Sequence, residues 1–182
     1  MAEALGVVGL AYPIVKDLLK VAKKLRRLHK QIRNAKNELS SVIERTITVA
    51  RTYDLFRETM AVARGIQGLA PLFKRHQQLI KSIDNESKRT IGSLRHITRR
   101  FRSLRRGKPI STVERLIAQF EWTRESKKTV PSLFQNMEVL ERSMRTTATL
   151  VNIQLLSQTY QQDPSDAVMA QLYITITPPI DR

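Results

Sequence analysis

The chain has no cysteine and only three histidines among its 182 residues. The absence of cysteine excludes disulfides, thiolate catalysis and the zinc or iron–sulfur sites that need cysteine ligands. The histidines are His29, His76 and His96, and none has a metal-ligand partner three or four residues away on its predicted helix. The sequence therefore predicts neither a metal nor another cofactor.

Phosphate-binding loops are missing as well. The glycine pairs Gly6–Gly9 and Gly65–Gly68 lack the preceding strand and the Lys-Ser/Thr of a P-loop. The sixteen acidic residues are scattered along the chain and suggest no catalytic carboxylate pair. We therefore expect that the protein is not an enzyme.

Long apolar runs are also absent, since no stretch reaches the roughly 18 apolar residues that a spanning helix needs. Gly9 and Ala11 resemble the small residues before a signal-peptide cleavage site. However, Glu3 stands where a basic n-region belongs, and a basic helical pattern follows directly. We interpret the N-terminus as part of one soluble domain, for which the length and the 41% apolar fraction suffice.

Acidic residues are few relative to basic ones. Lys and Arg total 32 against 16 Asp and Glu, which gives a net charge of +16. A field of this sign favours polyanionic partners, either nucleic acid or an anionic membrane surface.

The first residues form an apolar head, defined here as residues 1–15. Twelve uncharged residues lie between Glu3 and Lys16, which as a helix cover roughly 18 Å and are too short to span a bilayer singly. Two interpretations stay open: the head packs into the protein core at rest, or it is released and inserts into a membrane. The candidate insertion residues are Leu5, Gly6, Val7, Val8, Gly9, Leu10, Ile14 and Val15.

A basic amphipathic helix follows the head. From Lys16 to Arg33 there are eight basic residues and one acid, Asp17, while apolar residues recur every three or four positions. Basic residues near an anionic leaflet gain up to about 1 kcal/mol each. The candidate anionic-lipid residues are Lys16, Lys20, Lys23, Lys24, Arg26, Arg27, Lys30 and Arg33.

A second basic patch lies further along the chain, in a segment without an acid between residues 87 and 108. Its candidate members are Arg95, Arg99, Arg100, Arg102, Arg105 and Arg106. Nucleic acid is the alternative partner, but Phe101 is the only aromatic there and its seam position predicts burial, which leaves no stacking platform. No base-reading motif is present either, so no specific nucleic acid is expected.

Hydrophobic periodicity predicts an all-α protein with four helices. We expect an antiparallel four-helix bundle over residues 1–162, with a short apolar N-terminal segment. The helices are predicted over about 14–33, 35–64, 69–106 and 111–162.

Three local features refine this expectation. Ser111 and Glu114 have the spacing of a capping box that starts the last helix, and Pro131 predicts a kink or a split of that helix near residue 131. The same helix is expected to turn Leu116, Phe120 and Thr123 inward. Ser87 and Thr90 interrupt the apolar seam of the third helix, which predicts a locally wet core or a rotation that brings Ile91 inward.

Residues 163–182 are expected to form a short extended C-terminal tail or linker. Within it, residues 172–177 are β-branched and uncharged before two prolines. A short extended segment is the simpler interpretation, and a self-assembling amyloid segment is the alternative.

The N-terminal sequence also carries a family resemblance. Met1 to Ala11 (MAEALGVVGLA), then a helix, then Ile32 to Leu39 (IRNAKNEL) resembles the N-terminal, HeLo-like helical domains of fungal NLR-type (STAND) receptors and related cell-death proteins. That group is itself similar to the four-helix bundles of plant resistance proteins and of the mixed-lineage-kinase-like necroptosis executioner. The resemblance covers the first 60 residues best.

The resemblance implies a helical bundle whose N-terminal segment, residues 2–15 here, is freed on oligomerisation and attacks the membrane. It implies a cytoplasmic cell-death or innate-immunity effector that self-associates and moves to the plasma membrane, with an NLR-type sensor as a candidate partner. A helical signalling or oligomerisation module without membrane activity is the main alternative, and non-specific nucleic-acid binding is the second.

Overall fold

The structure is a computed structural model and describes residues 11–32, 36–66, 69–101 and 111–162. These residues form four helices, which confirms the expected all-α four-helix bundle. They are α2 (Ala11–Gln31), α3 (Lys36–Arg64), α4 (Ala70–Arg100) and α5 (Thr112–Gln162). The predicted tail, with its segment 172–177, lies outside the described residues.

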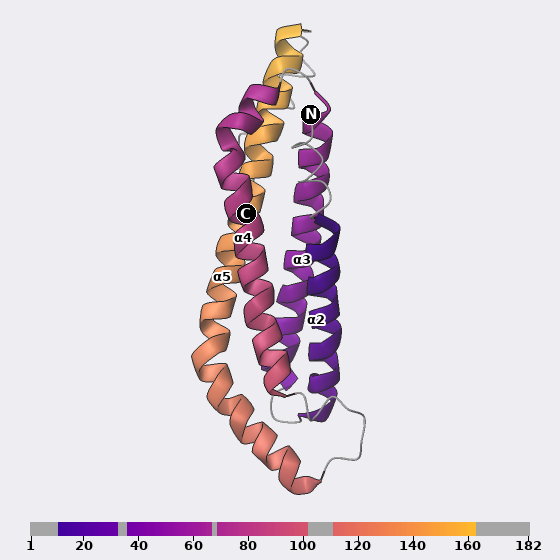
Figure 1. The fold of residues 1–182 in the computed structure, drawn as a ribbon, viewed down its shortest axis with the longest axis vertical. Coiled ribbons are helices and arrows are strands. Elements are labelled where there is room, and N and C mark those ends of the chain that lie inside the picture. Colours follow the sequence, from indigo (N-terminus) through magenta and orange to yellow (C-terminus); the bar gives the residue numbers. More distant parts are fainter. Residues whose placement is uncertain (1–10, 33–35, 67–68, 102–110, 163–182) are drawn as a thin grey trace, which may run out of the picture.

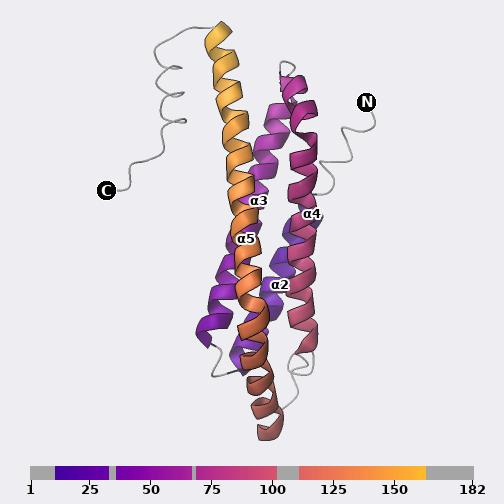
Figure 2. The ribbon, with the colours of Figure 1, turned by 90° about the vertical axis from the view of Figure 1, so that its left-hand side faces the viewer.

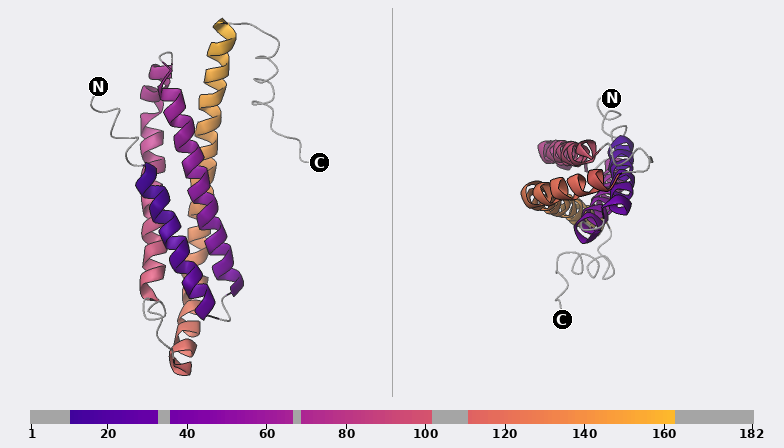
Figure 3. Two further views of the ribbon diagram at one scale, coloured as in Figure 1. Left: turned by 90° about the vertical axis from the view of Figure 1, so that its right-hand side faces the viewer. Right: turned by 90° about the horizontal axis from the view of Figure 1, so that it is seen from below.

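Consecutive helices run in opposite directions along an elongated bundle (Figures 1 and 2). Around the bundle the order is α2, α3, α5, α4, because α2 packs on α3 and α4, and α5 packs on the same two helices. The neighbouring pairs α2–α4 and α3–α5 therefore run in the same direction (Figure 3). The C-terminal ends of α2 and α4 and the N-terminal ends of α3 and α5 consequently lie at one end of the bundle, called the α5-start end below.

The core follows the predicted helical period over most of its length. Leu18, Leu25 and Leu28 of α2 are fully buried, as are Leu39 and Tyr53 of α3, Leu94 and Ile97 of α4, and Met137 and Met144 of α5. In α4 the rotation does bring Ile91 inward at 4% exposure, but Ser87 and Thr90 stay buried beside it. The Ser87 hydroxyl donates to the carbonyl of Ile83 at 2.8 Å, whereas Thr90 Oγ1 has no hydrogen-bond partner.

Helix α2 begins earlier than expected, at Ala11 rather than near residue 14. Pro13 is tolerated because the first turn of a helix has no intrahelical partners for its N–H groups. Ile14 is 4% exposed and belongs to the core, and Val15 is half-buried against it. Their burial agrees with the interpretation that the head packs into the core at rest, and their insertion on release stays a prediction. The other candidate insertion residues, Leu5, Gly6, Val7, Val8, Gly9 and Leu10, lie outside the described residues.

Helix α4 ends at Arg100, six residues before the predicted end at residue 106. The chain leaves the helix at Phe101, whose ring is buried and contacts that of Trp122 on α5 with 5.7 Å between centroids.

Of the two effects predicted for Pro131, a split of the helix near residue 131 is wrong. Helix α5 continues through Pro131 and is curved (Figure 1). A proline removes one helix hydrogen bond, to the carbonyl of Lys127 in this case. Pro131 and Lys127 are both exposed, so water can donate to that carbonyl instead. Contacts on both sides of the proline hold the helix in place, since Glu125 pairs with Arg100 of α4 before it and Glu141 pairs with Arg45 of α3 after it.

The start of α5 is capped as predicted but rotated relative to the predicted core face. Glu114 N–H donates to Ser111 Oγ at 3.2 Å, and Ser111 N–H donates to Glu114 Oε2 at 3.0 Å, which confirms the capping box. Leu116 and Phe120, predicted to be buried, are 60% and 73% exposed, and Thr123 is exposed too. Here α5 extends beyond the start of α3 and the end of α4 (Figure 1), so neither helix covers these three side chains.

Candidate functional site

The clearest surface feature is the basic face of α2, defined as Lys20, Lys23, Lys24, Arg26, Arg27 and Lys30. All six side chains are exposed, and none has an ion pair with any residue that the structure describes. Lys16 is exposed on the same helix, and Arg33 lies outside the described residues. The opposite side of α2 is buried in the core, which confirms the amphipathic helix and fixes which side is presented to solvent.

The contact of α2 with α4 shows that part of this basic face lies beside α4. Asp17 pairs with Arg95 of α4 at 2.8 Å, so the side of α2 that carries Asp17 lies alongside α4. Lys20, Lys24 and Arg27 follow Asp17 at helical spacing and share that side. The basic face thus borders the last turns of α4 and reaches the α5-start end of the bundle (Figure 1).

The second basic patch is weaker than the sequence predicts. Arg95 is paired with Asp17, and Arg100 is paired with the nearly buried Glu125 of α5. Arg99 is exposed, while Arg102, Arg105 and Arg106 lie outside the described residues. An acid-free run in the sequence therefore overstates the free charge, because the neutralising carboxylates come from other helices.

Apolar surface lies within the basic face. Val15 and Leu19, the latter 47% exposed, line a shallow hollow of about 360 Å³ together with Lys16, Lys20 and Lys23. A neighbouring hollow of about 500 Å³ runs between α2 and α3 and again includes Leu19 and Lys23. Cations and aliphatic groups therefore alternate over this surface, which suits a partner that is both anionic and apolar.

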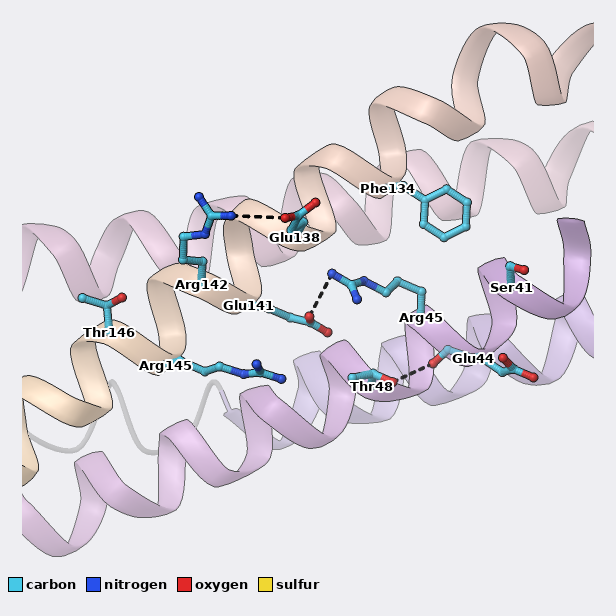
Figure 4. A pocket seen from close by; sticks show the side chains of 10 residues that line it. All are labelled: Ser41, Glu44, Arg45, Thr48, Phe134, Glu138, Glu141, Arg142, Arg145 and Thr146. Atoms are coloured by element: carbon cyan, nitrogen blue, oxygen red, sulfur yellow. Dashed lines mark hydrogen bonds and ion pairs between the residues drawn. The ribbon is translucent and has the colours of Figure 1, made fainter. Parts of the chain in front are cut away.

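A larger groove of about 760 Å³ lies between α3 and α5 (Figure 4). Across it Arg45 pairs with Glu141 at 3.0 Å, and Glu141 is buried with its second oxygen, Oε1, lacking a hydrogen-bond partner. Arg142 pairs with Glu138 at 3.2 Å along the rim. Both signs of charge line this groove, so it does not select for an anionic partner as the basic face of α2 does.

A polar link between α3 and α4 crosses the core of the bundle. The Tyr53 hydroxyl of α3 donates to Asp84 Oδ1 of α4 at 2.7 Å, and both residues are buried. Burial, and then the hydrogen bond to Asp84, raise the pKa of Tyr53 well above its ordinary value. The link joins two helices and has no access to solvent, so its role is structural. Among the residues that the structure describes, no cluster of potential metal ligands is found.

The start of α5 carries surface residues that sequence periodicity assigned to the core or did not single out. Val113, Leu116, Ile117 and Phe120 are 64%, 60%, 55% and 73% exposed. Their spacing fits a core face as well as an outer one, and only the position of the neighbouring helix ends distinguishes the two. In the structure the burial of Trp122, two residues after Phe120, turns Phe120 outward.

Comparison with protein families, with curated proteins and with solved structures gives no match for this chain. The fold and the surface described above therefore carry the functional argument. None of the helices in the described ranges is both long and apolar enough to cross a bilayer.

Proposed function

We propose that the protein binds anionic membranes through the basic face of α2 and acts as a self-associating effector of cell death in innate immunity. The observation that carries the membrane step is the set of six exposed cations on one helix without ion pairs among the described residues. Unpaired like charges repel one another. An anionic leaflet relieves that repulsion and stabilises the complex by up to about 1 kcal/mol per cation.

A membrane fits this surface better than nucleic acid does. The hollows beside the cations are lined by Val15 and Leu19, which suit acyl chains or the glycerol region of lipids. Nucleic acid bound without sequence preference is favoured by exposed aromatic rings for stacking, and the basic face has none. Phe101, the aromatic nearest in sequence to Arg99 and Arg100, is buried against Trp122.

The cell-death role rests on the resemblance of the first 60 residues to HeLo-like domains. In this proposal the protein is cytoplasmic until an NLR-type sensor or a similar trigger promotes self-association at the plasma membrane. The basic face then holds the bundle on the leaflet, and residues 5–10 of several copies insert together. Ile14 and Val15 stay in the core, which makes the inserting segment shorter than residues 2–15.

Vesicle co-sedimentation tests the membrane step. The variant K20Q/K23Q/K24Q/R27Q removes four cations from the basic face, and K74Q/R75Q/K81Q/K88Q removes three Lys and one Arg, all exposed, from α4. We expect wild type and the α4 variant to bind phosphatidylserine-containing vesicles, and the α2 variant to bind at least about tenfold more weakly. Equal loss in both variants, or equal binding to neutral phosphatidylcholine vesicles, would contradict the assignment of the site.

Dye release from the same vesicles tests permeabilisation. Deletion of residues 2–10 removes the candidate inserting residues 5–10 and retains Ile14 and the other described core residues. We expect this variant to bind anionic vesicles but to release less dye than the full chain. Release that is unchanged by the deletion would remove residues 5–10 from the mechanism. Self-association in solution without any vesicle binding would instead support a helical signalling module.

A further inference from the structure

We propose that the first ten residues of α5 form a second membrane-contacting element, which inserts an apolar tip into the interfacial region of the bilayer. The inference rests on the proposed anionic-membrane function and names the part of the molecule that penetrates the leaflet before any release of the N-terminus. The tip is defined as Val113, Leu116, Ile117 and Phe120.

The start of α5 projects past the rest of the bundle. Trp122 anchors α5 to its neighbours near this end, since its ring contacts Phe101 after the end of α4, and Ala118, one turn closer to the start of α5, is still buried. The Trp122 Nε1–H donates to Glu38 Oε2, in the first turn of α3, at 2.8 Å. The ten residues before Trp122 therefore extend about 15 Å beyond these contacts. Figure 1 shows this segment below the ends of the other described helices.

The apolar residues lie on the outer side of this projection. Ala118 and Trp122, one helical turn apart, are 5% and 2% exposed and face inward. The tip residues are offset from them by about half a turn and are each more than half exposed. Four large apolar side chains thus point away from the bundle on adjoining turns, which is unusual for a surface without a partner.

The charges that follow the tip identify its partner as a lipid surface. Along the same outer face the next exposed charged residues are Arg124, Lys127 and Lys128, one and two turns after Phe120, and none has an ion pair with a described residue. A cationic band about 6–12 Å above an apolar tip matches the order of acyl region and phosphate layer met on entering a bilayer. The basic face of α2 reaches the same end of the bundle, so both surfaces can contact one leaflet.

The capping box gives this projection the stability that it lacks from packing. Ser111 and Glu114 satisfy two N–H groups at the first turn, and the Ser111 hydroxyl donates to the Glu114 carboxylate at 3.0 Å. The only acid of the first turn is therefore occupied in the cap. A helix that is formed before contact loses less conformational entropy on binding than a loop does.

An environment-sensitive fluorophore tests the insertion, because the chain has no cysteine and a single introduced one can be labelled uniquely. We expect an NBD label at Phe120→Cys to show a blue shift and higher intensity with phosphatidylserine-containing vesicles. The same label at Leu55→Cys of α3, an exposed apolar position at 64%, is expected to show neither change. No spectral change at residue 120, while the protein co-sediments with the vesicles, would overturn the inference and leave the proposed function intact.

A pair of serine variants tests the energetic role of the tip. Leu116→Ser with Phe120→Ser is expected to weaken binding to anionic vesicles about tenfold or more. Leu55→Ser with Val62→Ser replaces two residues of similar exposure on α3 and is expected to bind like wild type. Unchanged thermal midpoints show that both pairs fold.

Two other outcomes lead away from the inference. If the tip variants bind vesicles normally but lose self-association by analytical ultracentrifugation, the tip is an interface between copies and the inference is overturned. If the wild-type protein fails to co-sediment with anionic vesicles at all, the proposed function fails first, and the inference falls with it.

Discussion

At the scale of single residues, the polar link between Tyr53 and Asp84 fixes how α3 and α4 face each other. These helices are diagonal in the bundle, so the 2.7 Å hydrogen bond crosses the core. A buried carboxylate is costly without a donor. The tyrosine hydroxyl supplies that donor, and its ring adds apolar volume and a tilted contact with Phe56 at 6.3 Å between centroids.

Tyr53→Phe removes only the hydroxyl and leaves Asp84 without this donor. We expect a loss of about 1–3 kcal/mol in the free energy of unfolding, as is usual for a buried polar group that loses its partner. The thermal midpoint should fall by about 2–4 °C per kcal/mol for a chain of this size. Differential scanning calorimetry measures the change, and an unaltered midpoint would show that Asp84 finds another donor.

The same pair gives a pH dependence with a definite sign. The pKa of Tyr53 is raised in the folded protein, first by burial and then by the hydrogen bond to Asp84, while nearby Arg57 acts in the opposite direction. The associated stability is fully present below the unfolded pKa of about 10 and is lost as the pH rises beyond it. The difference in midpoint between wild type and Tyr53→Phe should therefore shrink above about pH 10. A difference that stays constant to higher pH would contradict the link.

Sequence periodicity predicted the exposed residues of α2 and most core positions, because burial on an amphipathic helix depends on local spacing. The pairing of Arg95 with Asp17, and of Arg100 with Glu125, was not predictable in this way. Each pair joins helices whose adjacency follows from the order α2, α3, α5, α4, and helical spacing alone does not encode that order. The free charge of a basic run is thus a property of the packed bundle.

At the scale of elements, α5 shows that tertiary packing can override the local effect of a proline on a helix. Its 51 residues include Pro131, yet the helix bends instead of breaking. Just before the bend, Glu125 accepts from Arg100 of α4 and from Thr129, whose hydroxyl is 2.5 Å away. These contacts anchor the first half of α5, while Met137, Leu140 and Met144 anchor the second half in the core.

Pro131→Ala restores the missing hydrogen bond to the carbonyl of Lys127 at an exposed position. We expect the free energy of unfolding to rise by about 1–3 kcal/mol, since proline in a helix interior is about 3 kcal/mol less favourable than alanine. The free energy of unfolding is measured by chemical denaturation, with circular dichroism as the signal. If the stability drops instead, the bend itself is required to bring Trp122 onto Phe101 and Glu38, and near-ultraviolet signals from Trp122 should change as well.

The ends of the helices were the least predictable part of the fold. The start of α5 was predicted from the Ser111–Glu114 capping box, which is a local signal. The end of α4 and the exposure of Leu116 and Phe120 depend on where the other helices stop, which their own periodicity does not specify. The apolar tip could therefore be recognised only once the positions of the other helices were known.

At the scale of the whole molecule, positive charge is spread unevenly over a well-packed core. Ion pairs with Asp17, Glu125 and Glu141 join different helices, whereas the pair of Arg89 lies within α4 and the pair of Arg142 lies within α5. The six cations of the basic face of α2 and those that follow the apolar tip have no ion pair with any described residue. Because the apolar core carries the stability and the net charge is +16, electrostatic repulsion should oppose folding overall.

This balance predicts that salt stabilises the protein. The Debye length falls from about 30 Å at 0.01 M to about 10 Å at 0.1 M salt, which screens repulsion among the exposed cations more than it weakens the shielded pair of Glu141. We expect the thermal midpoint to rise by about 3 °C or more over this range. The variant K20Q/K23Q/K24Q/R27Q should start from a higher midpoint at low salt and gain less from added salt, because its α2 has already lost most of the repulsion. A wild-type midpoint that falls with salt would mean that the ion pairs between helices outweigh the repulsion among the exposed cations. The basic face would then contribute correspondingly less free energy to binding of an anionic membrane.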